Sequence, residues 1–242
     1  LLGGAYIRGM QDAGIIPTGK HFPGHGDTGI DSHISMPLVG HNRERLMNIE
    51  LKPYTELIKE GLLGIMTAHI VYPGLLDDDE AGLPATLYKN IITNLLRKEM
   101  GFEGLILSDS LAMRGIKDVY GLEKSAVMAV KAGHDIILQD YNTNPELTLN
   151  AVVDAVESGE IQIEMVNNSV ERILNVIERM GNLDNKPLDI DNVKRITGDP
   201  EHRAAAREIA DKSVTLLESK SIPIDIKPGE RTLIIATVSD IE

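Results

Sequence analysis

Three histidines and two aspartates lie within fourteen residues near the amino-terminal end of the chain, in the segment from Lys20 to His33. The segment reads KHFPGHGDTGIDSH, and Pro23 and Gly24 are the first of several residues in it that a helix does not tolerate. The polar groups are therefore expected on a shaped loop. Loops held by a rigid scaffold are where catalytic side chains commonly lie.

Two kinds of chemistry could use this segment. Histidines and carboxylates together could hold a divalent metal, as in metal-dependent hydrolases built on barrels. Alternatively, a carboxylate nucleophile at the end of one strand could act with a proton donor on a neighbouring loop, as in a retaining glycosidase. The spacing of Asp31 and His33 matters for the second chemistry, because the carboxylate can accept from one imidazole nitrogen and leave the other for proton transfer.

Asp109 is a further candidate because it follows the apolar run 105–107 almost directly. An acid at the tip of a buried strand is costly to ionise unless it is paired or used. The competing interpretation is structural, since Ser108 or Asp109 could cap a helix over residues 111–116. The residues alone leave both interpretations open.

Three other polar residues border apolar runs. His69 ends the run that includes residues 65–68, and it could be a satisfied core histidine or line the site; we favour lining. His134 and Asp135 stand at the beginning of their run. In a barrel that end of a strand serves stability, so we interpret both as structural.

The elements that must position these residues are strands alternating with amphipathic helices, which predicts an α/β fold with a parallel sheet. We expect strands at residues 14–22, 62–70, 104–108 and 135–138, and helices at residues 5–13, 42–60, 86–100, 122–132 and 145–158. The strand centres are roughly 30 to 48 residues apart, which suits successive units of a (β/α)8 barrel. A closed barrel of about 250 residues needs eight units. The four visible units therefore predict the second half of a TIM barrel.

The predicted domain boundaries follow from this pattern. Residues 1–181 form the carboxy-terminal half of the barrel, and residues 182–220 form a linker and helix, with helical patterns at 164–180 and 201–217. A strand pattern at 231–238 indicates that residues 221–242 begin a second, truncated α/β sandwich domain.

Composition excludes several classes of partner. The formal net charge of −13 argues against nucleic acid and anionic membrane surfaces. No stretch reaches the roughly 18 consecutive apolar residues of a membrane span. The absence of cysteine excludes disulfides and thiolate metal sites.

Taken in order, the motifs resemble glycoside hydrolase family 3, and within it the β-N-acetylglucosaminidase branch. They are KHFPGHG at 20–26, DSH at 31–33, MTAHI at 66–70, PAT at 84–86 and SDSLAM at 108–113. The resemblance covers about residues 1–180, and the long first motif with its downstream Asp-x-His is the specific part. It implies an exo-acting, retaining enzyme that removes terminal N-acetylglucosamine from cell-wall fragments.

The resemblance also assigns roles. Asp109 would be the nucleophile, and His33 the general acid/base with Asp31 as its partner. Lys20 and His21 would bind the sugar hydroxyls. The remaining members of the expected substrate-binding set are His25 and His69. No metal or cofactor is implied, the expected partner is an amino-sugar oligosaccharide, and the second-domain remnant favours the cell envelope.

Some features depart from the family pattern. Ser110 stands where some members have a second Asp, at a position that is not the nucleophile. Family members also supply an Asp and an Arg from earlier strands, and this chain has no counterpart, so we expect the isolated 242 residues to be poorly active or inactive. Phosphorolysis, a metal-dependent barrel hydrolase and a non-catalytic carbohydrate-binding fragment remain the alternatives.

Overall fold

The computed structural model describes residues 1–29, 36–76, 82–140, 142–181 and 189–215. The chain divides into two compact units, Leu1–Asn185 and Lys186–Glu242. The strand expected at 231–238, and with it the whole of the predicted sandwich domain, lies outside the described residues. None of the helices in the described ranges is long and apolar enough to cross a membrane.

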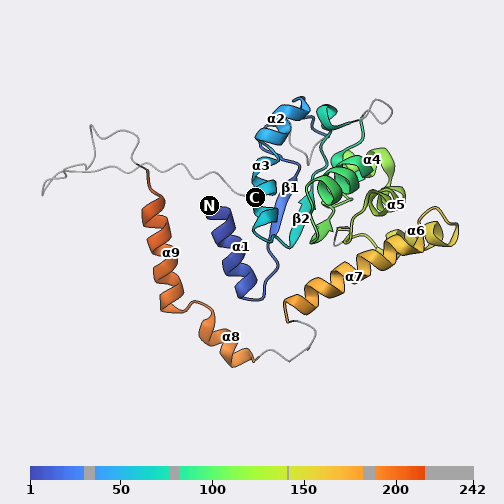
Figure 1. The fold of residues 1–242 in the computed structure, drawn as a ribbon. Helices are drawn as coiled ribbons and strands as arrows, with labels where there is room; N and C mark the ends of the chain where they lie inside the picture. The colour runs from blue at the N-terminus through green and yellow to red at the C-terminus, as the bar shows by residue number, and fades with distance from the viewer. Residues whose placement is uncertain (30–35, 77–81, 141, 182–188, 216–242) are drawn as a thin grey trace, which may run out of the picture. The chain divides into compact units, whose positions relative to one another are not determined.

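A parallel sheet lies at the centre of the first unit (Figure 1). Its strands β1 (Thr18–Phe22), β2 (Gly64–Thr67) and β3 (Leu105–Leu107) are hydrogen-bonded in the order β1-β2-β3. Each strand is followed by helical segments before the next begins, as expected for parallel strands that need crossover connections. The predicted mixed α/β class is confirmed.

The fourth predicted strand, residues 135–138, forms only one isolated parallel bridge, between Leu107 and Ile136. Some backbone hydrogen bonds to β3 form, such as that from the Ser108 amide to the Ile136 carbonyl at 3.0 Å, but side chains take others that a regular ladder would use. The Ile106 amide donates to Asp135 Oδ2 at 2.8 Å, and the Leu138 amide donates to Ser108 Oγ at 2.9 Å. The segment therefore lies beside β3 without becoming a regular strand.

The helix predicted over residues 42–60 is two helices, α2 (Arg43–Asn48) and α3 (Lys52–Lys59). Asn42 begins the first by accepting from the Arg45 amide at 2.9 Å. Pro53 explains the break, because a proline in the middle of a helix removes one hydrogen bond and clashes with the preceding turn. It is tolerated here in the first turn of α3.

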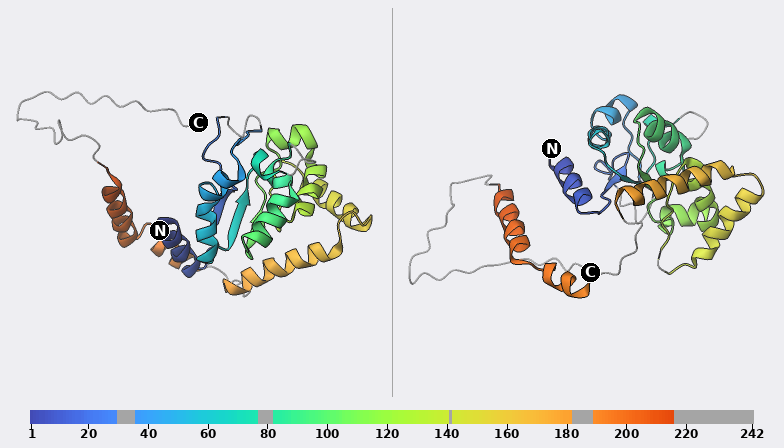
Figure 2. Two further views of the ribbon diagram at one scale, coloured as in Figure 1. Left: turned by 45° about the horizontal axis from the view of Figure 1, so that its top comes forward. Right: turned by 60° about the horizontal axis from the view of Figure 1, so that its bottom comes forward.

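Helices surround the sheet and extend beyond it (Figure 2). The remaining elements of the first unit are α1 (Leu2–Asp12), η1 (Pro73–Leu75), η3 (Ala85–Leu87), η4 (Asn90–Glu99), α4 (Arg114–Tyr120), α5 (Leu122–Ala132), α6 (Pro145–Glu157) and α7 (Ile163–Arg179). The helix expected over 86–100 is thus a short 3-10 turn followed by η4, which is wound with wider turns of the π type.

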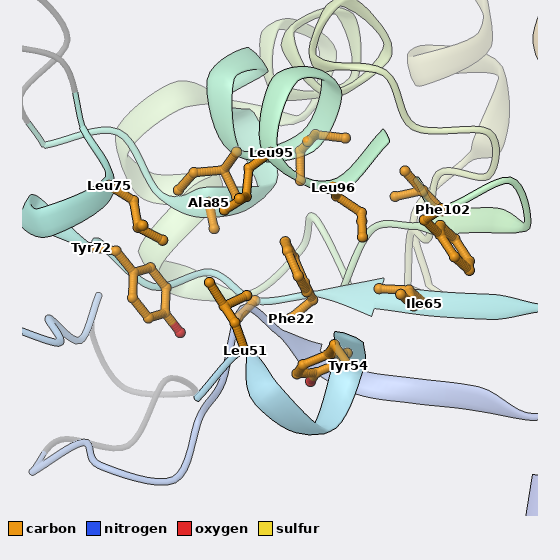
Figure 3. Close-up of a cluster of buried hydrophobic side chains, with 14 of the residues drawn as sticks. Phe22, Leu51, Tyr54, Ile65, Tyr72, Leu75, Ala85, Leu95, Leu96 and Phe102 are labelled. Atoms are coloured by element: carbon orange, nitrogen blue, oxygen red, sulfur yellow. The ribbon is translucent and has the colours of Figure 1, made fainter. Parts of the chain in front are cut away.

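The main hydrophobic core fills the space between the sheet and its neighbouring helices (Figure 3). Phe22 and Ile65 project from β1 and β2 and are fully buried. Tyr54 of α3 meets Phe22 edge to face, with ring centroids 5.1 Å apart. Leu96 of η4 packs in the same cluster. Burial of each such side chain stabilises the fold by about 1.5–3 kcal/mol.

The second unit contains α8 (Ile190–Ile196) and α9 (Pro200–Ser213). The first of these was expected to be linker. Its signal was present in Asp189, whose side chain accepts from the Asp191 and Asn192 amides and so caps the helix. Asp199 caps α9 in the same way.

Asp135 joins four elements of the first unit through one buried carboxylate with no exposed surface. Oδ2 accepts from Arg97 of η4 and from the Ile106 amide of β3. Oδ1 accepts from Arg172 Nε at 2.8 Å and Ser169 Oγ at 3.1 Å, both on α7. The structural role predicted for Asp135 is confirmed.

Asp135→Asn should lower the free energy of unfolding by about 3–5 kcal/mol, because it leaves two arginines around a neutral group. The exposed pair Lys131–Glu160 provides a matched control, since Glu160→Gln should cost less than about 1 kcal/mol. Urea unfolding followed by circular dichroism measures both. Equal losses in the two variants would contradict the central role of Asp135.

Candidate active site

His21 and Asp109 come together at the carboxyl ends of strands that flank β2. His21 is the fourth residue of β1, and Asp109 lies two residues beyond β3. His21 Nε2 is 3.5 Å from Asp109 Oδ2, and the two side chains are 25% and 22% exposed. His21 and Asp109 are 88 positions apart in the sequence, but their partly exposed side chains meet at one place on the surface.

Asp109 is not a helix cap. Its Oδ1 accepts from the Ser110 amide at 2.7 Å, which leaves Oδ2 toward His21. The next helix, α4, begins only at Arg114 and has no side-chain cap. Ser108 is buried and accepts from the Leu138 amide instead. The capping interpretation of these two residues is therefore wrong.

The first polar segment continues the site from β1. His25 lies edge-on to His21, with ring centroids 5.7 Å apart, and its Nδ1 is 3.2 Å from Thr28 Oγ1. Burial lowers the pKa of His21 below its ordinary value; the Asp109 carboxylate opposes this, and the Lys20 charge adds to it. Lys20 itself is exposed. The Lys20–His21 and Phe22–Pro23 peptide bonds are cis.

Neighbouring residues beyond β2 hold the chain at two points on either side of residues 30–35. The Tyr72 hydroxyl donates to the Gly24 carbonyl at 2.7 Å. Val71 exchanges backbone hydrogen bonds with the strand-like stretch around Val39, whose amide donates to the Val71 carbonyl at 2.9 Å. Gly24 has a φ of +142°, and a Cβ there would lie 2.8 Å from Glu50 Cβ, so glycine is required. Asp31 and His33 lie outside the described residues.

His69 is buried behind this site instead of lining it, with 2% of its surface exposed. Its Nε2 is 2.9 Å from the Ser110 carbonyl and its Nδ1 is 2.9 Å from Thr86 Oγ1. Both ring nitrogens are therefore engaged by protein groups, and the expected contact between His69 and the sugar is corrected on this ground. Burial lowers the pKa of His69, while the Ser110 carbonyl and the Asp109 carboxylate oppose that change.

Sequence reasoning did not find a role for Thr67, Thr86 or His134 at this place. Thr67 Oγ1 is 3.0 Å from Thr86 Oγ1 and 2.9 Å from His134 Nε2. The other nitrogen of His134 is 3.0 Å from the Ala129 carbonyl. The MTAH and PAT motifs hold both threonines, but only the fold brings their hydroxyls together.

One group in the described ranges has donors close enough to share a metal ion: Asp27, His41 and Glu50. Arg45 already approaches two of these carboxylates, at 3.5 Å from Asp27 and 3.3 Å from Glu50. The group contains neither His21 nor Asp109, so it does not support a metal in the candidate active site.

A cavity of about 660 Å³ lies elsewhere, beside Gly104 before β3, and none of the predicted site residues lines it.

The chain is similar to known proteins over most of its length. Residues 1–176 match the Glycosyl hydrolase family 3 N terminal domain. Beta-hexosaminidase A of Pseudoalteromonas piscicida is 32% identical over an alignment of 236 residues that covers 91% of this chain and 39% of that protein. A glycoside hydrolase family 3 beta-N-acetylglucosaminidase structure from Paenibacillus sp. str. FPU-7 matches with a TM-score of 0.81 and 41% identity, covering 90% of this chain and 41% of that one.

A structure of the beta-glucoside phosphorylase BglX also matches, with a TM-score of 0.82 and 27% identity over 91% of this chain and 40% of that one. The chain therefore spans 39% to 41% of the length of these relatives.

The burial of His134 predicts a loss of stability in mild acid. Burial lowers the pKa of His134 from 6.5 to about 4. Between these values the unfolded chain binds a proton that the folded chain does not, so the free energy of unfolding falls by about 3 kcal/mol as pH drops through this window. His134→Gln should remove that part of the pH dependence. Urea unfolding of both proteins at a series of pH values from 7 to 4 tests this, and parallel curves would contradict it.

Proposed function

The chain belongs to glycosyl hydrolase family 3, and on that premise we propose that it carries the catalytic residues of a retaining exo-β-N-acetylglucosaminidase. The proposed substrate is a terminal N-acetylglucosamine on a cell-wall fragment. The names beta-hexosaminidase and beta-N-acetylglucosaminidase, carried by the relatives described above, support the sugar class.

The observation that carries the proposal is the approach of His21 Nε2 to Asp109 Oδ2, at 3.5 Å. In Asp109 a backbone amide holds Oδ1, while Oδ2 belongs to a partly exposed side chain and can be reached by a substrate. A carboxylate held in this way is suited to attack a carbon atom. His21 stands beside it and can donate a hydrogen bond to a hydroxyl of a bound sugar. We propose the same role for Lys20, the exposed residue that precedes His21 in β1. Neutral His21 is favoured by its burial, and it keeps one N–H for this purpose.

The reaction has two balanced steps. Asp109 attacks the anomeric carbon, so that a carboxylate–sugar bond forms while the glycosidic bond breaks, and the leaving oxygen takes a proton from His33. Water then gives a proton to His33 and attacks the same carbon, which releases the sugar and restores the Asp109 carboxylate. Asp31 accepts from the other nitrogen of His33 and fixes its tautomer.

The anchoring of the chain on either side of residues 30–35 supports a role for Asp31 and His33. Gly24 is held by Tyr72, and the stretch around Val39 is held by Val71. The described residues on both sides of positions 30–35 are therefore attached just after the end of β2. That strand lies between the strands that carry His21 and Asp109.

The same premise extends to the architecture. The parallel order β1-β2-β3, continued by the bridge to Ile136, supports four successive units from the second half of a (β/α)8 barrel. We further propose that residues 221–242 begin an α/β sandwich domain.

Asp109→Ala should lower kcat for an aryl N-acetylglucosaminide by at least about 1,000-fold, because it removes the attacking oxygen. Asp118→Asn is the matched control, since Asp118 is an exposed acid on α4, and it should keep full activity. The measurement uses the protein as it is naturally expressed. Comparable activity of Asp109→Ala and the control would exclude Asp109 as nucleophile.

Phosphorolysis is the second candidate reaction, favoured by the structural match to a beta-glucoside phosphorylase. Here phosphate takes the place of water in the second step. Product analysis with and without phosphate separates the two reactions, since hydrolysis yields free sugar and phosphorolysis yields a sugar 1-phosphate.

His33→Ala should leave a slow reaction that is least impaired for substrates whose leaving groups need no proton. His202→Ala, which removes an exposed histidine of α9, is the control. The measurement compares kcat/KM across aryl glycosides of graded leaving-group acidity. A loss of the same size for every leaving group would count against His33 as the proton donor.

A further inference from the structure

Four polar side chains form a buried row beneath the candidate active site: Thr67, His69, Thr86 and His134. Each is at most 3% exposed, and neighbours along the row are 2.9 to 3.0 Å apart. Buried polar groups are retained at a cost in stability unless they are hydrogen-bonded. The proposed reaction uses none of these four side chains.

Donors and acceptors in the row can be assigned from the carbonyl groups at its two ends. A carbonyl only accepts, so His69 must carry a proton on Nε2, toward Ser110, and His134 must carry one on Nδ1, toward Ala129. In the neutral rings, which burial favours, the remaining nitrogens are acceptors. The Thr86 hydroxyl then donates to His69 Nδ1. The single proton of the Thr67 hydroxyl is shared between two acceptors, Thr86 Oγ1 at 3.0 Å and His134 Nε2 at 2.9 Å. The Thr86 proton is shared with the Ala68 carbonyl, which is also 2.9 Å away.

This assignment fixes the tautomer of His69 with its N–H directed at Ser110. Ser110 is thereby held from both sides of its backbone, since its amide donates to Asp109 Oδ1 and its carbonyl accepts from His69. The position of the Asp109 carboxylate thus depends on His69, which follows β2 and lies 40 positions earlier in the chain.

We propose that His69 is a positioning residue for Asp109, acting through Ser110, and that Thr86, which accepts from Thr67, fixes the tautomer of His69. The proposal rests on Asp109 being the nucleophile. A displacement of about 1 Å in a reacting group can cost about 100-fold in rate. Loss of the His69 N–H should therefore appear in kcat and leave KM nearly unchanged.

The kinetic test compares His69→Leu with His69→Gln. The leucine lacks any donor and should lower kcat about 10- to 100-fold with KM within about 2-fold of the wild type. The glutamine can donate to Ser110 and accept from Thr86, and should recover most of the activity. A rise in KM with unchanged kcat in His69→Leu would overturn the proposal, because it would indicate direct binding of the sugar.

A second pair of variants covers the case in which His69→Leu does not fold. Thr86→Val should lower kcat while Thr86→Ser retains it. Thr93→Val is the matched control, because the Thr93 hydroxyl also donates to a backbone carbonyl, that of Ala132, but lies outside the row. Equal effects of Thr86→Val and Thr93→Val on kcat would overturn the proposal in favour of a general structural role.

A readout without turnover separates this proposal from the proposed function. The Ser110 amide proton reports its hydrogen bond to Asp109 in nuclear magnetic resonance spectra. In His69→Leu that resonance should move toward the position of a weaker hydrogen bond, and in His69→Gln it should stay. An unchanged resonance in His69→Leu would refute the positioning role. Expected shifts in a protein without glycosidase activity would refute only the proposed function.

Discussion

The first unit depends on the buried carboxylate of Asp135. It lies at the point where β3, the segment beside it, η4 and α7 meet, and each of these supplies a hydrogen-bond donor or the carboxylate itself. Arg97 extends the connection, since it also donates to the Phe102 and Gly104 carbonyls and lies 5.4 Å above the Phe102 ring. Such a buried charge is stable only when all its partners are present, so the carboxylate links local segments into one cooperative unit.

The carboxylate acts at one end of the sheet and the candidate site forms at the other. β2 keeps β1 and β3 at neighbouring positions in the sheet, and the register sets Gly64 against both Thr18 and Leu105. The spacing of His21 and Asp109 is therefore a consequence of strand pairing. The buried row of hydroxyls and imidazoles begins at the end of β2 with Thr67 and His69, so buried polar groups lie behind the partly exposed His21 and Asp109.

Much of this arrangement could be predicted from the sequence, and the exceptions have physical reasons. The apolar runs predicted all three regular strands because buried parallel strands need continuous apolar residues. The break before Pro53 and the start of α8 at Asp189 were missed, although both signals are local and could have been found in the sequence. The irregularity of the fourth strand could not be found there, because the competing hydrogen bonds of Asp135 and Ser108 join residues about 30 positions apart. His69 was identified as important but given the wrong contact, because only the fold shows that Ser110 and Thr86 occupy its ring nitrogens.

Two adjacent residues hold the chain on either side of residues 30–35: the Tyr72 side-chain hydroxyl binds Gly24, and the Val71 backbone binds the stretch around Val39. These contacts fix the position of the chain at Gly24 and near Val39. They do not fix the number of residues in the connection between those two points. Doubling the length of such a connection costs only about 0.6 kcal/mol of closure entropy. A change in chain length within residues 30–35 should accordingly leave the pairing of β1, β2 and β3 intact. The approach of His21 to Asp109, which depends on that pairing, would then persist whatever the length of the connection.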